Sequence, residues 1–189
     1  MKEYDYSQPG GYFVTIVTKD RAMLLGTIVD GTVVLSPSGE IIAYWWRQIP
    51  RHFEFVECDQ FIIMPNHIHG IMIIHEHPNV GAAAGPRPDQ GVPPAGVRKP
   101  GVRQPDPYTD QKRPTLGQVV AYFKYQSTKQ INANLGCAGN KIWQRNYYER
   151  VLRGDDELNR AKEYILNNPL QWEMDRENPV VSGSEERGK

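Results

Sequence analysis

The chain has 189 residues, enough for one domain with a buried core, and its 22 basic side chains balance 22 acidic ones. Its two cysteines form no disulfide framework, no apolar run approaches the roughly 18 residues of a membrane span, and the polar, acidic residues 1–9 do not resemble a signal peptide. These observations exclude a disulfide-rich secreted scaffold and a membrane-spanning protein, so we expect a soluble protein of the cytoplasm.

Regular elements fill the first 77 residues. Runs of β-branched and aromatic residues predict five strands, at 11–18, 27–29, 32–35, 53–63 and 66–74. The second and third of these strands form a hairpin across an Asp-Gly turn. Ser36 or Ser38 caps a predicted helix that runs to about His52. The apolar stripe of this helix consists of Ile41, Ile42, Trp45 and Ile49.

Residues 78–114 differ in composition from the rest of the chain. They hold 9 of the 15 prolines and 5 glycines, with almost no apolar side chains to bury, so we expect a long disordered insertion. Residues 1–172 then form a single domain that this insertion interrupts, and 173–189 form a polar tail. Beyond the insertion, helical spacing predicts helices over 115–133 and from about 155 to 168.

This order of elements predicts an α+β fold. A ferredoxin-like antiparallel sheet covered by helices is the natural arrangement, and we expect the helices on one face of the sheet.

Charge is unevenly distributed along the chain. Residues 111–172 carry 10 basic and 5 acidic side chains, a net charge of +5, whereas residues 1–77 carry 5 and 9, a net charge of −4. A basic segment rich in Tyr and Trp indicates nucleic-acid binding, although a solvated helix face explains the charge equally well. The candidate DNA-binding residues are Lys124, Trp143, Arg145, Tyr147, Tyr148, Arg150 and Arg160.

Two histidines lie one residue apart in the predicted strand over 66–74. Alternate side chains of a strand share a face, so His67 and His69 project together and can bind one divalent cation. Two structural histidines are the alternative reading of the same pair. His75 and His77 share their parity, but about 26 Å of strand separates His75 from His67, so we expect them outside this site.

The last predicted helix carries a second set of polar residues. Tyr164 and Asn168 are four residues apart and therefore stack on one helix face, with Arg160 one turn earlier. Ordinary packing at the edge of the core, together with a helix cap, is the alternative interpretation.

Together these segments resemble the HUH single-tyrosine transposases, and most closely the REP-associated tyrosine transposases. The resemblance lies in residues 4–6 (YDY), 10–15 (GGYFVT), 64–70 (MPNHIHG), 143–149 (WQRNYYE) and 164–169 (YILNNP). It implies a ferredoxin-like enzyme that nicks and rejoins single-stranded DNA near hairpins. By motif position, His67 and His69 match the metal-binding histidines and Tyr164 the nucleophile. Asn168 falls where relatives place a third polar ligand, often Gln.

The residue types suit that chemistry. A tyrosine that attacks a phosphodiester leaves a 5′-phosphotyrosine and a free 3′-OH, so the strand can be rejoined without ATP. Two imidazoles and an amide suit Mg²⁺ or Mn²⁺, and imidazole also favours Zn²⁺. Lys162 or Arg160 is the cation expected beside the phenol. Tyr147 and Tyr148 are rival nucleophiles.

Two alternatives to this enzyme stay open. One is a domesticated, sequence-specific DNA-binding protein without cleavage activity, and the other is a small hydrolase that uses activated water. We expect a monomer, with a dimer left open.

Overall fold

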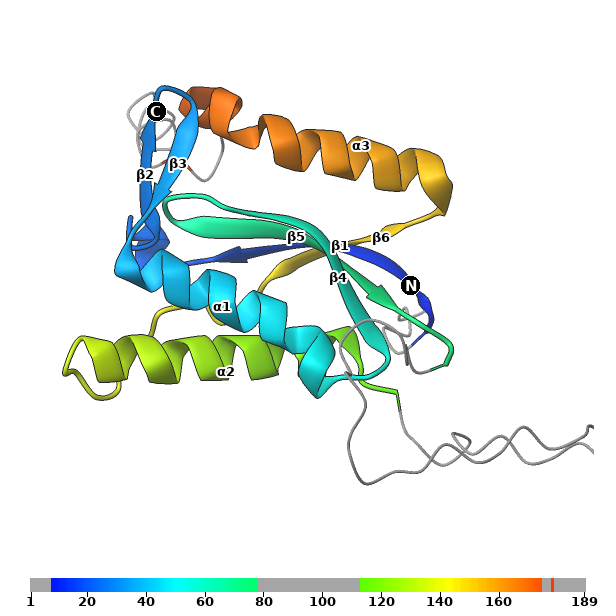
Figure 1. The fold of residues 1–189 in the computed structure, drawn as a ribbon, viewed down its shortest axis with the longest axis horizontal. Helices are drawn as coiled ribbons and strands as arrows, with labels where there is room; N and C mark the ends of the chain where they lie inside the picture. The colour runs from blue at the N-terminus through cyan, green and yellow to red at the C-terminus, as the bar shows by residue number, and fades with distance from the viewer. Residues whose placement is uncertain (1–7, 78–112, 175–177, 179–189) are drawn as a thin grey trace, which may run out of the picture.

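A four-stranded antiparallel sheet in the order β4-β5-β1-β6 forms the centre of the computed structural model (Figure 1). The structure describes residues 8–77, 113–174 and 178. The predicted insertion therefore lies almost wholly outside the described residues, as does most of the predicted tail. The strands are β1 (Gly10–Val17), β2 (Gly26–Val29), β3 (Thr32–Leu35), β4 (Val56–Ile63), β5 (His67–Ile74) and β6 (Tyr148–Leu152). The helices are α1 (Pro37–His52), α2 (Leu116–Asn134) and α3 (Gly154–Asn167), with 3-10 turns η1 (Lys19–Arg21) and η2 (Asn168–Met174).

The connectivity of the sheet confirms the predicted fold class. With the β2–β3 hairpin set aside, the chain runs β1-α1-β4-β5-α2-β6, and β5 pairs antiparallel with both β1 and β4. Each central strand thus begins a strand–helix–strand crossover that ends on an edge strand, from β1 to β4 and from β5 to β6, which is the ferredoxin-like arrangement. Within the described part of the chain, no helix has the length and apolar character needed to cross a membrane.

Local signals in the sequence set most element boundaries. Ser36 caps α1 by accepting a hydrogen bond from the backbone N–H of Gly39, and Thr115 forms a reciprocal capping box with Gln118 at the start of α2. The β2–β3 hairpin closes through Asp30 and Gly31, which both have positive φ values, as a two-residue turn of this handedness requires.

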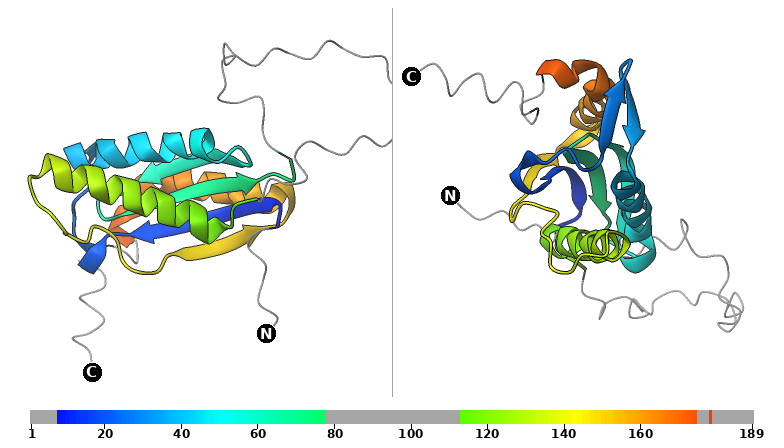
Figure 2. Two further views of the ribbon diagram at one scale, coloured as in Figure 1. Left: turned by 90° about the horizontal axis from the view of Figure 1, so that it is seen from below. Right: turned by 90° about the vertical axis from the view of Figure 1, so that its left-hand side faces the viewer.

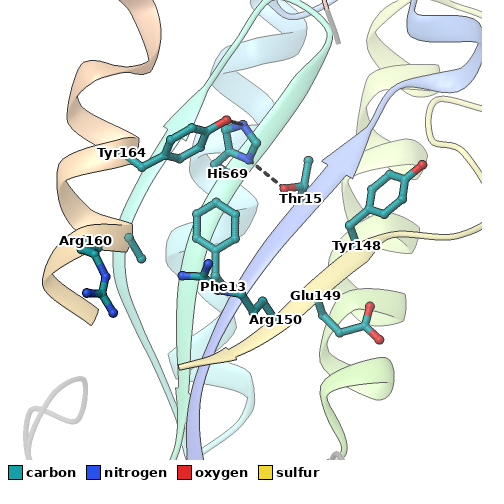
Figure 3. A pocket seen from close by; sticks show the side chains of 9 residues that line it. Phe13, Thr15, His69, Tyr148, Glu149, Arg150, Arg160 and Tyr164 are labelled. Atoms are coloured by element: carbon teal, nitrogen blue, oxygen red, sulfur yellow. Dashed lines mark hydrogen bonds between the residues drawn. The ribbon is translucent and has the colours of Figure 1, made fainter. Parts of the chain in front are cut away.

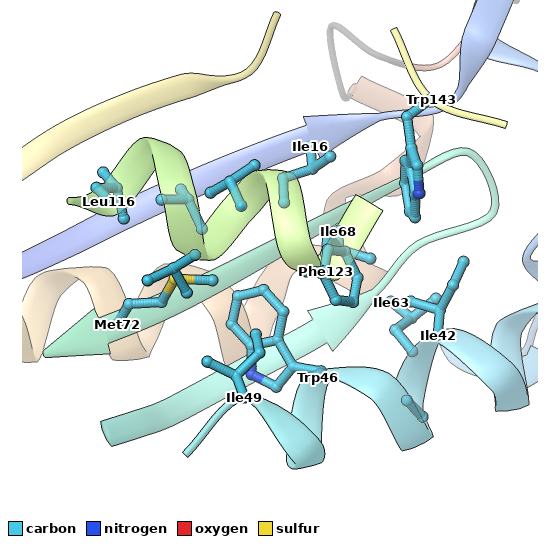
Figure 4. Close-up of a cluster of buried hydrophobic side chains, with 14 of the residues drawn as sticks. Ile16, Ile42, Trp46, Ile49, Ile63, Ile68, Met72, Leu116, Phe123 and Trp143 are labelled. Atoms are coloured by element: carbon cyan, nitrogen blue, oxygen red, sulfur yellow. The ribbon is translucent and has the colours of Figure 1, made fainter. Parts of the chain in front are cut away.

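Helices cover both faces of the sheet, so the expectation of a single covered face was wrong. Figures 1 and 2 show α1 and α2 on one side of the sheet and α3 on the other. Even-numbered residues of the central strands, such as Val14, Ile68 and Met72, join the larger core under α1 and α2 (Figure 4). Odd-numbered residues face α3, where the smaller core of buried residues comprises Ile71, Leu152, Ala161 and Ile165.

One tight contact joins the central strand to α1. A Cβ atom at Gly70 would lie 2.3 Å from the Trp46 ring, closer than any real Cβ contact, so only glycine fits beneath this indole. Trp46 is 1% exposed, whereas Trp45 lies only partly buried at the edge of the core. The apolar stripe predicted from the sequence included Trp45, but it is Trp46 that enters the core.

Candidate active site

The two histidines of β5 lie side by side on the face of the sheet that α3 covers. Their Nε2 atoms are 3.0 Å apart, and both side chains are buried. This arrangement follows from the alternation of side chains along a strand. The sequence prediction that His67 and His69 project together is confirmed.

Each imidazole is oriented by a hydrogen bond at its Nδ1 atom. His67 Nδ1 lies 2.9 Å from Asn66 Oδ1, and the Asn66 amide nitrogen donates to the backbone carbonyl of Arg21. Because Asn66 Oδ1 can only accept, His67 Nδ1 carries the proton. Burial lowers the pKa of His67 to about 3, so the ring is neutral near pH 7 and its Nε2 atom presents a lone pair. On the second ring, His69 Nδ1 lies 2.8 Å from Thr15 Oγ1.

Tyr164 reaches this pair of histidines from α3. Its hydroxyl lies 3.5 Å from His69 Nε2, and its side chain remains partly open to solvent (Figure 3). Phe13 of β1 lies against both rings, stacked on His69 at a centroid distance of 5.4 Å and edge-on to Tyr164 at 5.9 Å. The phenol is therefore held beside the imidazole by packing as well as by polar contact.

Asn168 is buried at the junction of α3 and η2, and its Oδ1 atom has no hydrogen-bond partner among the described residues. It lies four residues after Tyr164, which contacts His69, and four before Trp172, whose ring lies 6.0 Å from that of His67. This spacing places Asn168 on the helix side that faces the histidines. A buried amide oxygen without a partner calls for an explanation, and a bound cation supplies one.

The residues fit a divalent metal ion. Two nitrogen ligands that each lie about 2.1 Å from one ion at right angles are about 3 Å apart, which matches the observed separation of the Nε2 atoms. Within the described ranges no group of three His, Cys, Asp or Glu side chains lies together, so a third ligand from these residues would be of another type. Asn168 Oδ1 is a candidate for that ligand.

A pocket of about 440 Å³ opens beside the phenol. Its walls come from β1, β5, β6 and α3, and Figure 3 shows the side chains around it. The lining residues are Phe13, Thr15, His69, Tyr148, Glu149, Arg150, Arg160, Ala161 and Tyr164. Three of the predicted DNA-binding residues, Tyr148, Arg150 and Arg160, thus share one pocket with the predicted nucleophile.

Other predicted DNA-binding residues lie elsewhere. Trp143 is only 7% exposed, packs on Phe123 in the larger core and donates its indole N–H to Ser127 Oγ, so its choice as a DNA-binding residue was wrong. The Lys124 ammonium donates to the carbonyls of residues 144–146 and lies over the Tyr147 ring. Burial lowers the pKa of Lys124 to about 8.

The remaining candidates divide in the same way. Arg145 is exposed, and for it DNA contact stays a prediction. Lys162, expected beside the phenol, instead forms an ion pair with Asp59 of β4 at 2.7 Å. His75 pairs with Glu57 at 3.0 Å near the end of β5, away from the histidine pair as expected.

Sequence reasoning missed four residues that shape the site: Phe13, Thr15, Asn66 and Trp172. Thr15 lies opposite His69 in the β1–β5 register, and a register is not readable from one strand alone. Asn66 stands directly before His67, so its position was a signal that could have been used. Trp172 lies in the 3-10 turn η2, where the α-helical spacing that relates Tyr164 and Asn168 no longer applies.

Comparison with known proteins places the chain among its relatives. An uncharacterized protein of Haemophilus influenzae (strain ATCC 51907 / DSM 11121 / KW20 / Rd) is 34% identical over 176 residues, which cover 93% of this chain and 89% of that protein. The chain belongs to the same family as this protein. No family model matches the chain.

Two solved structures are similar to this chain. One is a REP-associated tyrosine transposase bound to a REP hairpin, with 17% identity, a TM-score of 0.49 and coverage of 90% of this chain and 74% of that one. The other is a proposed transposase from Deinococcus radiodurans R1, with 14% identity, a TM-score of 0.42 and coverage of 88% and 96%. Because these identities and TM-scores are low, a functional argument has to come from the site itself.

Proposed function

We propose that the chain is a metal-dependent tyrosine transposase that nicks and rejoins single-stranded DNA near hairpins through a 5′-phosphotyrosine. One observation carries the proposal. The Tyr164 hydroxyl lies 3.5 Å from His69 Nε2, which is itself 3.0 Å from His67 Nε2, at the mouth of a pocket lined by Arg150 and Arg160. The motif resemblance to REP-associated tyrosine transposases supports the same reaction.

The reaction balances with the groups present. The Tyr164 oxygen forms a bond to the scissile phosphorus, and the bond from phosphorus to the 3′ oxygen breaks. The phenol loses its proton, and the leaving 3′ oxygen takes up a proton to become a hydroxyl group. The reverse step uses the 3′-OH as nucleophile and releases the phenol, so the strand is resealed without an external energy source. Mg²⁺ or Mn²⁺ held by His67, His69 and Asn168 would polarise the scissile phosphate as a Lewis acid.

The side chains around the pocket have separate tasks in this reaction. Arg150 and Arg160 supply positive charge for the phosphate, which guanidinium groups bind in a bidentate manner. Tyr148, 62% exposed at the rim, offers a ring on which an unpaired base can stack. Phe13 holds the phenol against His69, which keeps the nucleophile in one position.

Incubation with a labelled single-stranded hairpin oligonucleotide and Mn²⁺ tests the proposal directly. We expect a covalent protein–DNA adduct that survives denaturation in the wild-type chain and is absent in Tyr164→Phe, which lacks only one oxygen. Tyr148→Phe is the matched control and should still form the adduct. An adduct that persists in Tyr164→Phe would refute the assignment of Tyr164 as the nucleophile. DNA binding without any adduct in the wild type would indicate a DNA-binding protein without cleavage activity.

A further inference from the structure

A second basic surface lies on the opposite side of the sheet from the tyrosine. The outer side of α2 and the segment that follows it enclose a groove of about 420 Å³. Its walls include Lys129 and Asn132 from α2, and Asn140 and Lys141 from the following segment. We call this the α2 groove. Nothing in the candidate active site uses it.

The α2 groove belongs to a part of the chain without acidic residues. Residues 113–147 contain five basic side chains and no Asp or Glu. Lys129 and Lys141 are exposed on the groove, whereas the Lys124 ammonium is already bound to backbone carbonyls. Within this stretch of the chain no carboxylate offsets the positive charge, which is the charge pattern of a phosphate-binding segment.

The chain itself links the α2 groove to the candidate active site. Gln144 lines the groove, Arg145 is exposed, and Tyr148 lines the pocket beside Tyr164. Lys124 holds the carbonyls of this connecting segment, so the segment is fixed to α2. It leads to β6, which is the edge strand of the sheet formed by the described residues. DNA that passes this edge can contact both sides of the sheet.

We propose that the α2 groove binds the sugar–phosphate backbone of DNA that flanks the cleavage site on one side, so that one DNA molecule contacts both faces of the sheet. This inference rests on the proposed function. The lysines contribute through phosphate neutralisation, and their effect should depend on salt and on the length of one DNA flank.

The test measures DNA binding in a Tyr164→Phe background, in which cleavage does not alter the ligand. The oligonucleotides extend stepwise from the cleavage site at either the 5′ or the 3′ end, and binding is titrated from 50 to 200 mM salt. For the parent we expect affinity to rise with length at one end only. Lys129→Ala and Lys141→Ala should each remove part of that gain and lower the log–log salt slope by about 0.7 to 0.9, the change expected for one lost phosphate contact.

Arg51→Ala on α1 is the matched control, because it also removes one exposed positive charge from the same face of the molecule. It should leave both the length dependence and the salt slope unchanged. Three results would contradict DNA binding in the α2 groove. They are unchanged DNA affinity in both lysine variants, an equal loss of affinity in Arg51→Ala, and an equal loss of affinity for oligonucleotides extended at either end. Adduct formation by the wild-type chain is scored separately, so failure of the groove is distinguishable from failure of the proposed cleavage.

Discussion

The two faces of the central sheet are built from the same strands but are used differently. The face under α1 and α2 is mainly apolar, and its core includes Trp46, Phe123 and Trp143. The face under α3 has a small apolar core, beside which the buried polar residues His67, His69 and Asn168 gather. Burial of polar groups costs stability unless they are hydrogen-bonded, so the apolar face has to supply most of the stabilisation. The comparison indicates that one face stabilises the fold, whereas the other holds the candidate active site.

Substitutions at neighbouring positions of β5 provide the strongest test of this division. We expect His69→Ala to abolish adduct formation while the chain still folds, because the side chain faces α3 and its loss leaves the larger core intact. Ile68→Ala, one residue earlier, should lower the free energy of unfolding by about 2–5 kcal/mol, since it leaves a cavity in that core. Denaturant unfolding and the adduct assay measure the two effects, and a large loss of stability in His69→Ala would contradict the division.

Acid should weaken the fold through the polar face. The unfolded His67 takes up a proton below a pKa of about 6.5, whereas burial keeps the folded ring neutral down to about pH 3. The unfolded state then binds more protons between these values, so stability falls as the pH is lowered from 6.5 to 3, by a few kcal/mol for this group. His67→Gln should flatten the dependence in denaturant titrations across this range. An identical pH dependence in both proteins would argue against a buried neutral imidazole.

Gly70 tests how closely α1 packs on the central strand β5. Gly70→Ala places a methyl group against the Trp46 ring, so we expect a loss of about 1–3 kcal/mol from overpacking. Gly11→Ala is the control, because a Cβ atom at Gly11 would have ordinary contacts at 3.4 Å and more, so the substitution should cost less. Gly139 is unsuitable as a control because it has a positive φ. Thermal unfolding of Gly70→Ala and Gly11→Ala measures the difference, and equal losses would show that the indole moves aside easily.

The ion pair between Lys162 and Asp59 should give the smallest effect. Asp59 and Gln60 lie opposite the single residue Ile71 in a bulge of β4, and the pair joins this bulge to α3. Because both side chains are partly exposed, we expect at most about 1 kcal/mol of stability. We expect Lys162→Met to slow adduct formation severalfold by loosening the helix that carries Tyr164. A double-mutant cycle with Asp59→Asn isolates the coupling, and strictly additive effects would exclude it.

The sequence predicted those parts of the fold and site that depend on periodicity along one element. A period of two placed His67 beside His69, and helical spacing put Tyr164 and Asn168 on one side of α3. The second helical layer was missed although β5 is apolar on both of its faces, a pattern typical of a strand covered on both sides. Trp143 was misread because aromatic content alone does not show whether a ring points to solvent or into a core.

Contacts between distant segments account for most of what the sequence did not reveal. Thr15 meets His69 because of the β1–β5 register, and Lys162 meets Asp59 because of a bulge. Such pairings depend on the packed tertiary structure, and a single sequence holds no local record of them.

The amide of Asn66 joins His67 to a turn that lies 45 residues earlier in the chain. That turn contains Arg21, a non-glycine residue with φ of 52°, a conformation that persists only when its surroundings hold it. The Asn66 side chain thus keeps the proton on His67 Nδ1, and Asn66 is itself held by the carbonyl of a residue with a strained backbone conformation. A metal-ready imidazole therefore exists only in the folded chain, and any ion that binds there adds its binding free energy to the stability of the whole domain.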